Sequence, residues 1–513
     1  MRSSPALAAD ELAAADDVEA VDRRAVAAPA AADDVAPAVQ RLDDVVAGIA
    51  DEHVGAGPTH QRVSARIALD VIVGITRPIG TAGSLTLTRS GNRAGMRILL
   101  WHGYLLGGTG SNVYTRALAR AWGKTGHEVV VVCQERRPER YDLAGAQVVV
   151  PRLPGRLLPV FVLDAYEGLQ PKLLQDCTRT ELDAYVDANA SAIDDLLPAD
   201  LVFANHVLPG GAVAAASRAA RFAVKAHGSE LEYSMRANVE LAAWGRKSLT
   251  RAEATFVGSA HIRAVLEDVV GQVERVHEVP PGVDVEEFVP EQRERALERL
   301  LEECRRDPPN PSNAQERLPD EGNAERLEAW FASDEPTILY FGKLLYNKGV
   351  HVLFDALRET RSAPRALIVG FGDYRHELER TAPARTLFTG PLEHRHLVHL
   401  IPLCEVTVVP SIFPEAFGMV AAEAAAGGSL PLVARHSGLR EIAEGLEAEY
   451  PQPHRELTSF TTGEARELSS KLRRLLDLPA DERRTLSAAA RCAVVKRWSW
   501  ERVAERLLQP FNE

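Results

Sequence analysis

The chain has 513 residues, a length that corresponds to about two to four domains. Hydrophobic residues make up 46% and charged residues 26% of the sequence, which is the balance of a globular protein with sizeable cores. The net charge of −13 argues against a nucleic-acid binder that depends on a basic surface, and no apolar run has the roughly 20 residues of a membrane-spanning helix. Five widely spaced cysteines without a CxxC pair favour a reducing compartment over a disulfide framework or a zinc site.

The acidic charge is concentrated near the start of the chain. Residues 1–52 contain 12 acidic and 4 basic residues, are about one-third alanine and include no aromatic residue. Because such a segment has little to bury, we predict that residues 1–95 form a low-complexity, disordered extension. The extension lacks the basic start and apolar block of a secretory signal. Met96 directly precedes the first convincing strand, and it is either a true start or the end of a natural flexible tail.

Residues 96–284 alternate between apolar strands and helices. The predicted strands are 97–101, 128–132, 201–205, 222–226 and 255–258, and the first predicted helix is 112–125. Continuous apolar strands separated by helices are typical of a parallel sheet that is covered on both faces. We therefore predict a Rossmann-like, doubly wound α/β domain over residues 96–284.

A second α/β domain of the same kind is predicted over residues 337–490. Its strands are expected at 337–342, 366–369, 386–389, 406–410 and 430–434. Between the domains, residues 285–336 form a charged connector with a helical part over 292–306, interpreted as a surface elaboration. Residues 491–513 carry a last helix around 498–508, whose apolar face predicts packing back toward the first domain. Ligands of doubly wound sheets bind at the carboxyl ends of the strands, so the cleft between the domains is the predicted site.

A glycine-rich turn joins the first strand region to the first helix. Its residues are Gly107, Gly108, Thr109, Gly110 and Ser111, and Asn112 follows in the helix. Glycines let the backbone approach a ligand, and the helix start offers unpaired N–H groups to an anion. The turn does not match G-x-G-x-x-G, and the second strand does not end in an acidic residue, which argues against a nicotinamide oxidoreductase. A purely structural tight turn is the alternative interpretation.

Single polar residues follow several predicted strands at the same cleft edge. His227 comes after the strand at 222–226, where an imidazole can orient or polarise a substrate hydroxyl; a core or surface histidine is the alternative. Lys343 and Lys348 lie five residues apart on the loop after the strand at 337–342, and they can converge on a diphosphate. Ordinary solvated lysines are the alternative here.

Close-approach glycines support the interpretation of the lysine loop. Gly342 ends the strand before it, and Gly370 and Gly372 form a second glycine turn after the next strand. Such turns allow the backbone to approach a ligand or another loop closely.

The most specific pattern is a pair of glutamates seven residues apart. Glu415 lies on a loop after a strand, in Pro410-Ser-Ile-Phe-Pro-Glu-Ala-Phe-Gly418, and Glu423 lies in the first turns of the following helix. The first carboxylate can accept hydrogen bonds from sugar hydroxyls, and the second can reach a ribose. The N–H groups at the helix entrance can face a phosphate, and they belong to Phe417, Gly418, Met419 and Val420.

From about Met96 to Phe511 the chain resembles the retaining nucleotide-sugar glycosyltransferases of family 4, which have the two-Rossmann GT-B fold. The resemblance is most specific at the Glu-x7-Glu motif of Glu415 and Glu423, and Pro280-Pro-Gly-Val-Asp284 supports it. Lys343 stands where that family often has arginine, Pro281 stands where it often has asparagine, and the connector is longer than usual.

The resemblance implies a role for each candidate residue. The lysines matching Lys343 and Lys348 hold the donor diphosphate, Glu415 contacts the donor sugar, and Glu423 binds the ribose. His227 matches a first-domain histidine near the reacting sugar. The glycine turn lies near phosphate and acceptor, with Gly108 and Gly110 on the donor side and Gly107, Thr109, Ser111 and Asn112 on the acceptor side.

The expected function is retaining transfer from a nucleotide-diphosphate sugar, as co-substrate, to an acceptor hydroxyl. No Asp-x-Asp occurs in the chain, so we expect no metal and no further cofactor. The acceptor is a saccharide, a lipid-linked or a small molecule, and the apolar stretch 157–163 either faces a lipid acceptor or is buried core. The expected location is the cytoplasm, with peripheral contact with the inner face of the membrane left open. A nucleotide-sugar epimerase of the same plan and a non-catalytic nucleotide-sugar-binding relative are the alternatives.

Overall fold

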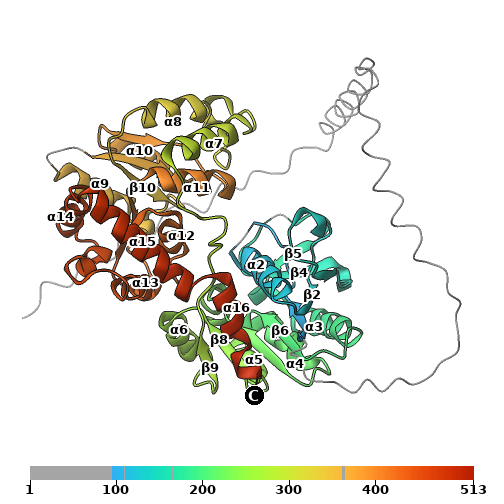
Figure 1. Ribbon diagram of the computed structural model, residues 1–513. Helices are drawn as coiled ribbons and strands as arrows, with labels where there is room; N and C mark the ends of the chain where they lie inside the picture. The colour runs from blue at the N-terminus through green and yellow to red at the C-terminus, as the bar shows by residue number, and fades with distance from the viewer. Residues whose placement is uncertain (1–94, 109, 165, 361–363, 513) are drawn as a thin grey trace, which may run out of the picture. The chain divides into compact units, whose positions relative to one another are not determined.

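The computed structural model describes residues 95–108, 110–164, 166–360 and 364–512, and the predicted disordered extension lies, up to residue 94, outside the described residues. The described chain is built from two parallel sheets and their helices (Figure 1). All five cysteines are among the described residues, and all five are free. No helix in the described part of the chain combines the length and apolar composition that a membrane span requires.

The first sheet has seven parallel strands in the order β3-β2-β1-β6-β7-β8-β9. The strands are β1 (Arg97–Trp101), β2 (Glu128–Val132), β3 (Gln147–Val149), β6 (Leu201–Asn205), β7 (Phe222–Lys225), β8 (Ala254–Val257) and β9 (Val276–Glu278). Its helices are α2 (Gly110–Lys124), α3 (Arg179–Asp194), α4 (Ala212–Ala216), α5 (Val239–Leu249) and α6 (Ala260–Val270). Along β1, Leu99 and Trp101 join one buried cluster, and Ile98 and Leu100 join another. Because successive side chains point to opposite faces, both faces of the sheet are covered, as the continuous apolar runs predict.

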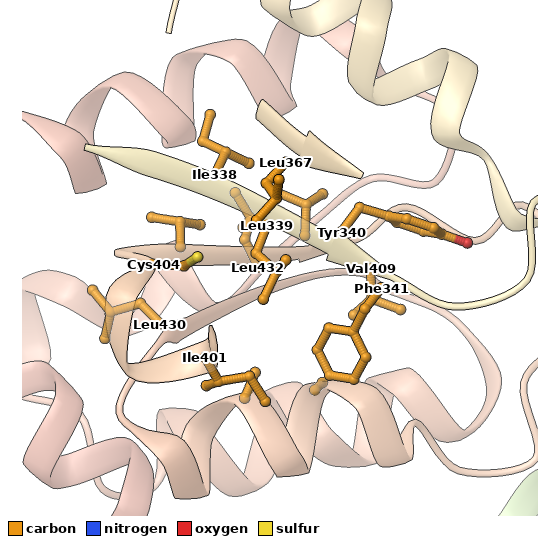
Figure 2. Close-up of a cluster of buried hydrophobic side chains, with 14 of the residues drawn as sticks. Ile338, Leu339, Tyr340, Phe341, Leu367, Ile401, Cys404, Val409, Leu430 and Leu432 are labelled. Atoms are coloured by element: carbon orange, nitrogen blue, oxygen red, sulfur yellow. The ribbon is translucent and has the colours of Figure 1, made fainter. Parts of the chain in front are cut away.

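The second sheet has six parallel strands in the order β12-β11-β10-β13-β14-β15. The strands are β10 (Thr337–Phe341), β11 (Arg365–Val369), β12 (Thr386–Phe388), β13 (Val406–Val409), β14 (Leu430–Ala434) and β15 (Ser459–Phe460). Its helices include α9 (Val350–Arg358), α10 (Arg375–Thr381), α11 (His394–Leu400), α12 (Met419–Gly427), α13 (Ser437–Glu447), α14 (Ala465–Leu476) and α15 (Ala480–Arg497). Figure 2 shows its core around β10, where Leu339 lies beside its strand partner Leu367 on β11. Two doubly wound units confirm the predicted α/β fold class.

The charged connector carries two helices that pack into the second unit. These are α7 (Arg293–Arg305) and α8 (Asn323–Phe331). Leu300 and Leu327 are fully buried and belong to the same core cluster as the strands of the second sheet. The connector is therefore packed against the second unit through its apolar residues and is not a detached loop.

The last helix packs on the first unit. α16 (Trp500–Leu508) contributes Val503 and Leu507 to the core cluster that contains β1 and α2. The indole N–H of Trp122 on α2 donates a hydrogen bond to the backbone oxygen of Ala504 at 3.1 Å. Trp498 precedes this helix instead of belonging to it.

Several short strands are absent from the expected elements. They are β3, β9 and β15 at the sheet edges, together with the two-stranded ribbon of β4 (Leu157–Val160) and β5 (Gln170–Leu173). The apolar stretch 157–163, expected either to be buried core or to face a lipid acceptor, is partly buried and partly exposed. Leu158 and Val160 are buried in β4, whereas Val162 and Leu163 are 62% and 60% exposed beyond the strand.

Candidate active site

A cavity of about 1430 Å³ lies at the carboxyl ends of strands from both sheets. The sequence-predicted residues that line it are Gly108, Gly110, Ser111, Asn112, His227, Gly342, Lys343, Lys348, Glu415, Phe417, Gly418, Met419, Val420 and Glu423. Gly107, Gly370 and Gly372 are not among its lining residues, and Thr109 lies outside the described residues. The position of the cavity is the one expected for a ligand site in doubly wound sheets.

Lys348 and Glu415 meet because two loops are pressed together. Gly349 follows Lys348 with φ of +72°, and a Cβ at this glycine would lie 2.0 Å from the backbone oxygen of Pro410. Only glycine allows this approach, which brings the loop after β10 against the loop after β13. The Lys348 Nζ lies 2.6 Å from Glu415 Oε1, and both side chains remain partly exposed to the cavity.

Lys343 is the second cation on this wall of the cavity. Its backbone oxygen accepts a hydrogen bond from the Tyr340 hydroxyl at 2.7 Å, which fixes the start of the loop. Its side chain is exposed, and its ammonium group makes no ion pair with any residue that the structure describes. The ammonium is therefore available to an anionic ligand.

The entrance of α12 presents backbone N–H groups to the same space. Gly418 precedes the helix with φ of +126°, and a Cβ there would lie 2.7 Å from the Leu439 side chain, so the turn requires glycine. The first N–H groups of a helix have no intrahelical partner, and the first turn of α12 has no acidic side chain to cap them. Together with Lys343 and Lys348, this positive helix end can hold a diphosphate.

The start of α13 holds the loop that carries Glu415. The Ser437 hydroxyl accepts a hydrogen bond from the Glu415 backbone N–H at 2.8 Å, and the Gly438 N–H donates to the Glu415 carbonyl at 3.0 Å. His436 Nε2 donates to the Ser411 carbonyl at 2.7 Å, so both ends of the loop are tied to one turn. Ser437 and His436 are not among the predicted site residues, because neither lies next to the motif in the chain.

Glu423 is a polar residue on an otherwise apolar helix. Alanines around it pack α12 against its neighbours, and the carboxyl group faces the cavity. Burial raises the pKa of Glu423 to about 7, although the nearby His394 partly opposes the shift. A protein carboxyl group is kept in such a costly environment for binding more often than for stability.

His394 and Glu287 also line this end of the cavity, and the sequence analysis missed both. His394 Nε2 lies 2.6 Å from Glu287 Oε2. Burial alone would lower the pKa of His394, but the hydrogen bond with Glu287 and the nearby charges of Glu287, Glu423 and Asp284 together raise it. No motif marks these residues, since they come from the connector and from the start of α11.

His227 follows β7 and lines the cavity from the first unit. Its Nε2 lies 2.7 Å from the Asn205 Oδ1, and its backbone N–H donates to Glu230 Oε1 at 2.9 Å. Burial and the neighbouring His206 and Lys225 hold the pKa of His227 well below its ordinary value. The imidazole is therefore neutral over the physiological pH range and exchanges hydrogen bonds rather than charge.

Lys225 lies at the end of β7 beside His227, and it is not among the predicted site residues. Its Nζ donates to the Val279 carbonyl at 2.6 Å. The side chain is buried, and burial together with the charge of Arg506 lowers its pKa to about 7. A lysine at the end of an apolar strand is the signal that could have identified it.

The glycine turn and the second glycine pair have structural contacts. Asn112 is buried, its Nδ2 donates to the Gly107 carbonyl at 2.5 Å, and its Oδ1 lies 2.8 Å from His102 Nε2. A Cβ at Gly370 would lie 1.8 Å from the Gly342 carbonyl, so this glycine lets two loops stack. The Gly372 N–H donates to the Glu316 carboxylate at 2.8 Å.

One cluster of metal-ligating residue types occurs among the described residues, and it lies outside the cavity. It contains Cys304, Asp307 and His396. His396 Nδ1 accepts the Glu393 backbone N–H at 3.1 Å, so its Nε2 must carry the proton of the neutral ring and cannot bind a metal. Arg395 also pairs with Asp307, which makes a second cation at this position unfavourable.

Two family models match the chain, one on each unit. Residues 109–282 match the glycosyl transferase 4-like domain, and residues 324–492 match glycosyl transferases group 1. The two matches cover most strands of the two sheets, although β1 lies before the first match.

Curated relatives are glycosyltransferases and related synthases. A D-inositol 3-phosphate glycosyltransferase of Xylanimonas cellulosilytica is 32% identical over 39% of this chain and 44% of its own length. An MMP alpha-(1->4)-mannosyltransferase of Mycolicibacterium hassiacum is 24% identical over 79% of this chain and 94% of its own length. The alignment with the glycogen synthase of Mycobacterium tuberculosis also covers only 42% of that protein, so the chain spans less than half the length of several relatives it matches.

Several solved structures share the fold of this chain. The Anabaena HepE structure in complex with UDP and glucose has a TM-score of 0.56 at 18% identity, covering 81% of this chain and 98% of that chain. Sucrose-phosphate synthase from Thermosynechococcus elongatus has a TM-score of 0.53 at 20% identity, covering 80% and 98%. The solved structures share the two-sheet fold of this chain, and the family matches and relatives support a glycosyltransferase.

Proposed function

We propose that this chain transfers a sugar from a nucleotide-diphosphate sugar to an acceptor hydroxyl with retention of configuration and without a metal ion. The observation that carries the proposal is the Lys348–Glu415 pair at 2.6 Å, which lies in the cavity beside Lys343 and the entrance of α12. This arrangement combines two cations and a positive helix end with a carboxylate that can accept sugar hydroxyls.

The chemistry follows from where charge develops. Breaking the bond between the anomeric carbon and the phosphate oxygen leaves negative charge on the diphosphate. Lys343, Lys348 and the first N–H groups of α12 stabilise that charge, and such fixed electrostatic groups usually supply the largest part of catalysis. Glu423 accepts hydrogen bonds from the ribose, and Glu415 accepts them from the sugar.

The carboxylate that accepts the His227 backbone N–H argues against a covalent glycosyl–enzyme intermediate. Glu230 is fully buried, and its oxygens accept hydrogen bonds from the backbone N–H groups of His227 and Val207. Glu230 is therefore not free to attack the anomeric carbon. In the proposed reaction the acceptor enters on the face that the phosphate leaves, and the leaving phosphate takes the acceptor's proton.

The relatives support a nucleotide-sugar donor, and they are compatible with several chemical classes of acceptor. Their printed names include a GDP-mannose-dependent mannosyltransferase of Corynebacterium glutamicum that acts on a phosphatidylinositol monomannoside. We propose a saccharide, a lipid-linked or a small-molecule acceptor for this chain, in the cytoplasm or at the inner face of the membrane. The half-buried Phe161 and the exposed Val162 line the cavity and would give an apolar acceptor a wall to pack on.

Ligand-induced stabilisation tests the donor site directly. UDP, GDP and ADP, each alone and as its glucose or mannose conjugate, are added to the full chain, and the melting temperature is followed with and without EDTA. At least one pair should raise the melting temperature equally in EDTA, because a ligand that binds only the folded state stabilises it. Stabilisation that requires magnesium would contradict the metal-free site, and no shift with any nucleotide would contradict the donor site.

Turnover of the best donor tests the assignment of roles. Lys348→Ala and Glu415→Ala should each lower turnover by at least about 100-fold, since each group supplies a few kcal/mol of transition-state stabilisation. Lys496→Ala is the matched control, because Lys496 is an exposed lysine paired with Glu449 outside the cavity. Near-normal transfer by Lys348→Ala would refute the role of this lysine.

A further inference from the structure

A chain of buried hydrogen bonds begins at Thr115 on α2. Thr115 is fully buried, and its hydroxyl donates to the Ser111 carbonyl at 2.8 Å. A carbonyl oxygen can only accept, so this bond uses the single hydroxyl proton of Thr115. Toward any other neighbour the Thr115 oxygen can therefore only accept.

The next member of the chain is Asn205, which ends β6 and is fully buried. The Asn205 amide nitrogen lies 3.1 Å from Thr115 Oγ1 and donates to it. Because Thr115 accepts only, the orientation of the amide is fixed, and Oδ1 must point the other way. Oδ1 lies 2.7 Å from His227 Nε2, so this ring nitrogen must carry the proton.

The other ring nitrogen of His227 is then without a proton. The imidazole is neutral, because burial and the adjacent His206, Lys225 and His102 lower its pKa well below the ordinary value. His227 lines the cavity, and among the described residues the only hydrogen bonds of this residue are those to Asn205 and Glu230. No hydrogen bond among the described residues uses Nδ1, so this nitrogen can accept one from a ligand in the cavity.

We propose that Thr115 and Asn205 are positioning residues that hold His227 as a pure hydrogen-bond acceptor, with Nδ1 set to receive a hydroxyl group of the sugar in the cavity. The inference rests on the proposed function for the identity of that sugar. In this arrangement the packing of α2 against β6 determines the hydrogen-bonding state of His227. The two positioning residues lie 90 positions apart in the chain.

Two consequences distinguish this arrangement from a histidine held only by packing. First, His227 cannot donate a proton to the leaving group, because its one proton is committed to Asn205. Second, the site discriminates between ligands: a sugar hydroxyl satisfies Nδ1, whereas a deoxy sugar leaves it unpaired.

Glu230 holds a different part of the same residue. Its carboxylate accepts the backbone N–H of His227 and thereby fixes the loop, but it does not contact the imidazole. The groups that face the ring are His206 at 4.7 Å and Tyr114 at 5.0 Å between ring centroids, with the Lys225 ammonium and His102 contributing charge from the neighbouring elements. The direct contact with the ring nitrogen comes from Asn205.

The protonation state can be measured without substrate. Long-range proton–nitrogen NMR correlations of the assigned His227 ring in the full chain should show a protonated Nε2 and an unprotonated Nδ1. Thr115→Val removes the acceptor that orients the amide while keeping its shape, so Asn205 can turn and the ring should become a mixture of both forms. Thr115→Ser keeps the hydroxyl and should preserve the wild-type spectrum.

Asn205→Asp gives a second variant if Thr115→Val does not fold. A carboxylate can only accept from the ring, so this variant should keep the proton on Nε2 and raise the pKa of His227 in an NMR titration. A wild-type ring protonated at Nδ1, or a Thr115→Val spectrum identical to the wild type, would overturn the proposal.

Binding separates this proposal from the proposed function. For the nucleotide that stabilises the wild type, Thr115→Val should leave the dissociation constant of the bare nucleoside diphosphate unchanged and weaken its sugar conjugate by about tenfold. Equal binding of the conjugate by wild type and variant would contradict the sugar contact. If no nucleotide binds to the wild type, the donor assignment fails while the NMR result still decides the state of His227.

Discussion

Among single residues, Glu423 shows most clearly that the cavity is maintained against stability. Its side chain is half-buried on a helix that otherwise packs through alanines, and burial raises its pKa to about 7. In the unfolded chain the same group ionises near its ordinary value, so the folded state holds a proton that the unfolded state has lost at intermediate pH. Stability therefore falls as the pH rises from about 4.5 to 7 and stays reduced above that range.

Glu423→Gln should remove this penalty. We expect the free energy of unfolding to increase by on the order of 2 kcal/mol at pH 8 and to remain unchanged at pH 4, measured by chemical denaturation at both values. The same variant should bind nucleotide more weakly, because an amide is a poorer acceptor for ribose hydroxyls than a carboxylate. An equal gain at both pH values would show that ionisation of Glu423 is not the cause.

The hydrogen-bonding state of His227 is a residue-scale property that the sequence cannot reveal. His227 itself is predictable as a polar residue after an apolar strand. Its partners are not, because Thr115 and Asn205 meet only when α2 packs against the end of β6. The sequence thus identifies the group that faces the ligand and leaves unknown the side chains that determine what it can bond.

At the scale of elements, the loop between β13 and α12 depends on the start of α13. Ser437 has φ of +42°, an uncommon conformation for a residue with a side chain, and its hydroxyl is what the Glu415 N–H donates to. The strained backbone and the hydrogen bond occur at one residue, which suggests that the hydroxyl compensates for the conformation.

Two substitutions at Ser437 separate these effects. Ser437→Ala keeps the strained backbone and loses the hydroxyl, so it should lower the free energy of unfolding by about 1–2 kcal/mol and raise the KM for the donor. Ser437→Gly also loses the hydroxyl but accepts the positive φ, so it should be more stable than Ser437→Ala while showing the same rise in KM. Denaturation and steady-state kinetics measure the two effects, and a normal KM in both variants would contradict a role in holding Glu415.

The helices of the connector are a second test at this scale. Leu327 on α8 is fully buried in the core of the second sheet, whereas the adjacent Glu328 is exposed. Leu327→Ala should lower the free energy of unfolding by about 2–5 kcal/mol, and Glu328→Ala should change it by less than about 0.5 kcal/mol. Equal small effects in thermal denaturation would mean that the connector is not part of the cooperative unit.

For the whole molecule, the order of strands and helices is largely predictable from the sequence. β1, β2, β6 and β14 begin and end where the apolar runs do, because central strands of a parallel sheet are buried on both faces. The edge strands β9 and β15 escaped prediction, since two or three residues at a sheet edge carry no repeating pattern. Charge composition also misleads at this scale, because the acidic connector contains Leu300 and Leu327 in a packed core.

The final helix links the end of the chain to the first unit, and this link can be tested. Leu507 is fully buried in the cluster that contains Trp122, although α16 follows the last helix of the second unit in the chain. Leu507→Ala should lower the free energy of unfolding by about 2–5 kcal/mol through the cavity it leaves, whereas the exposed Glu505→Ala should have little effect.

Hydrogen exchange identifies the helices that become less stable in Leu507→Ala. Peptides from α2 should lose protection in Leu507→Ala, because the helix packs on α16 through Trp122, whose indole also donates to the Ala504 carbonyl. Peptides from α12 should keep their protection, and the affinity for the bare nucleotide should stay within about twofold, since the diphosphate is held by groups of the second unit. Loss of protection confined to α16 would mean that this helix covers the first unit without stabilising it, whereas loss in both α16 and α2 would show that α16 stabilises the first unit.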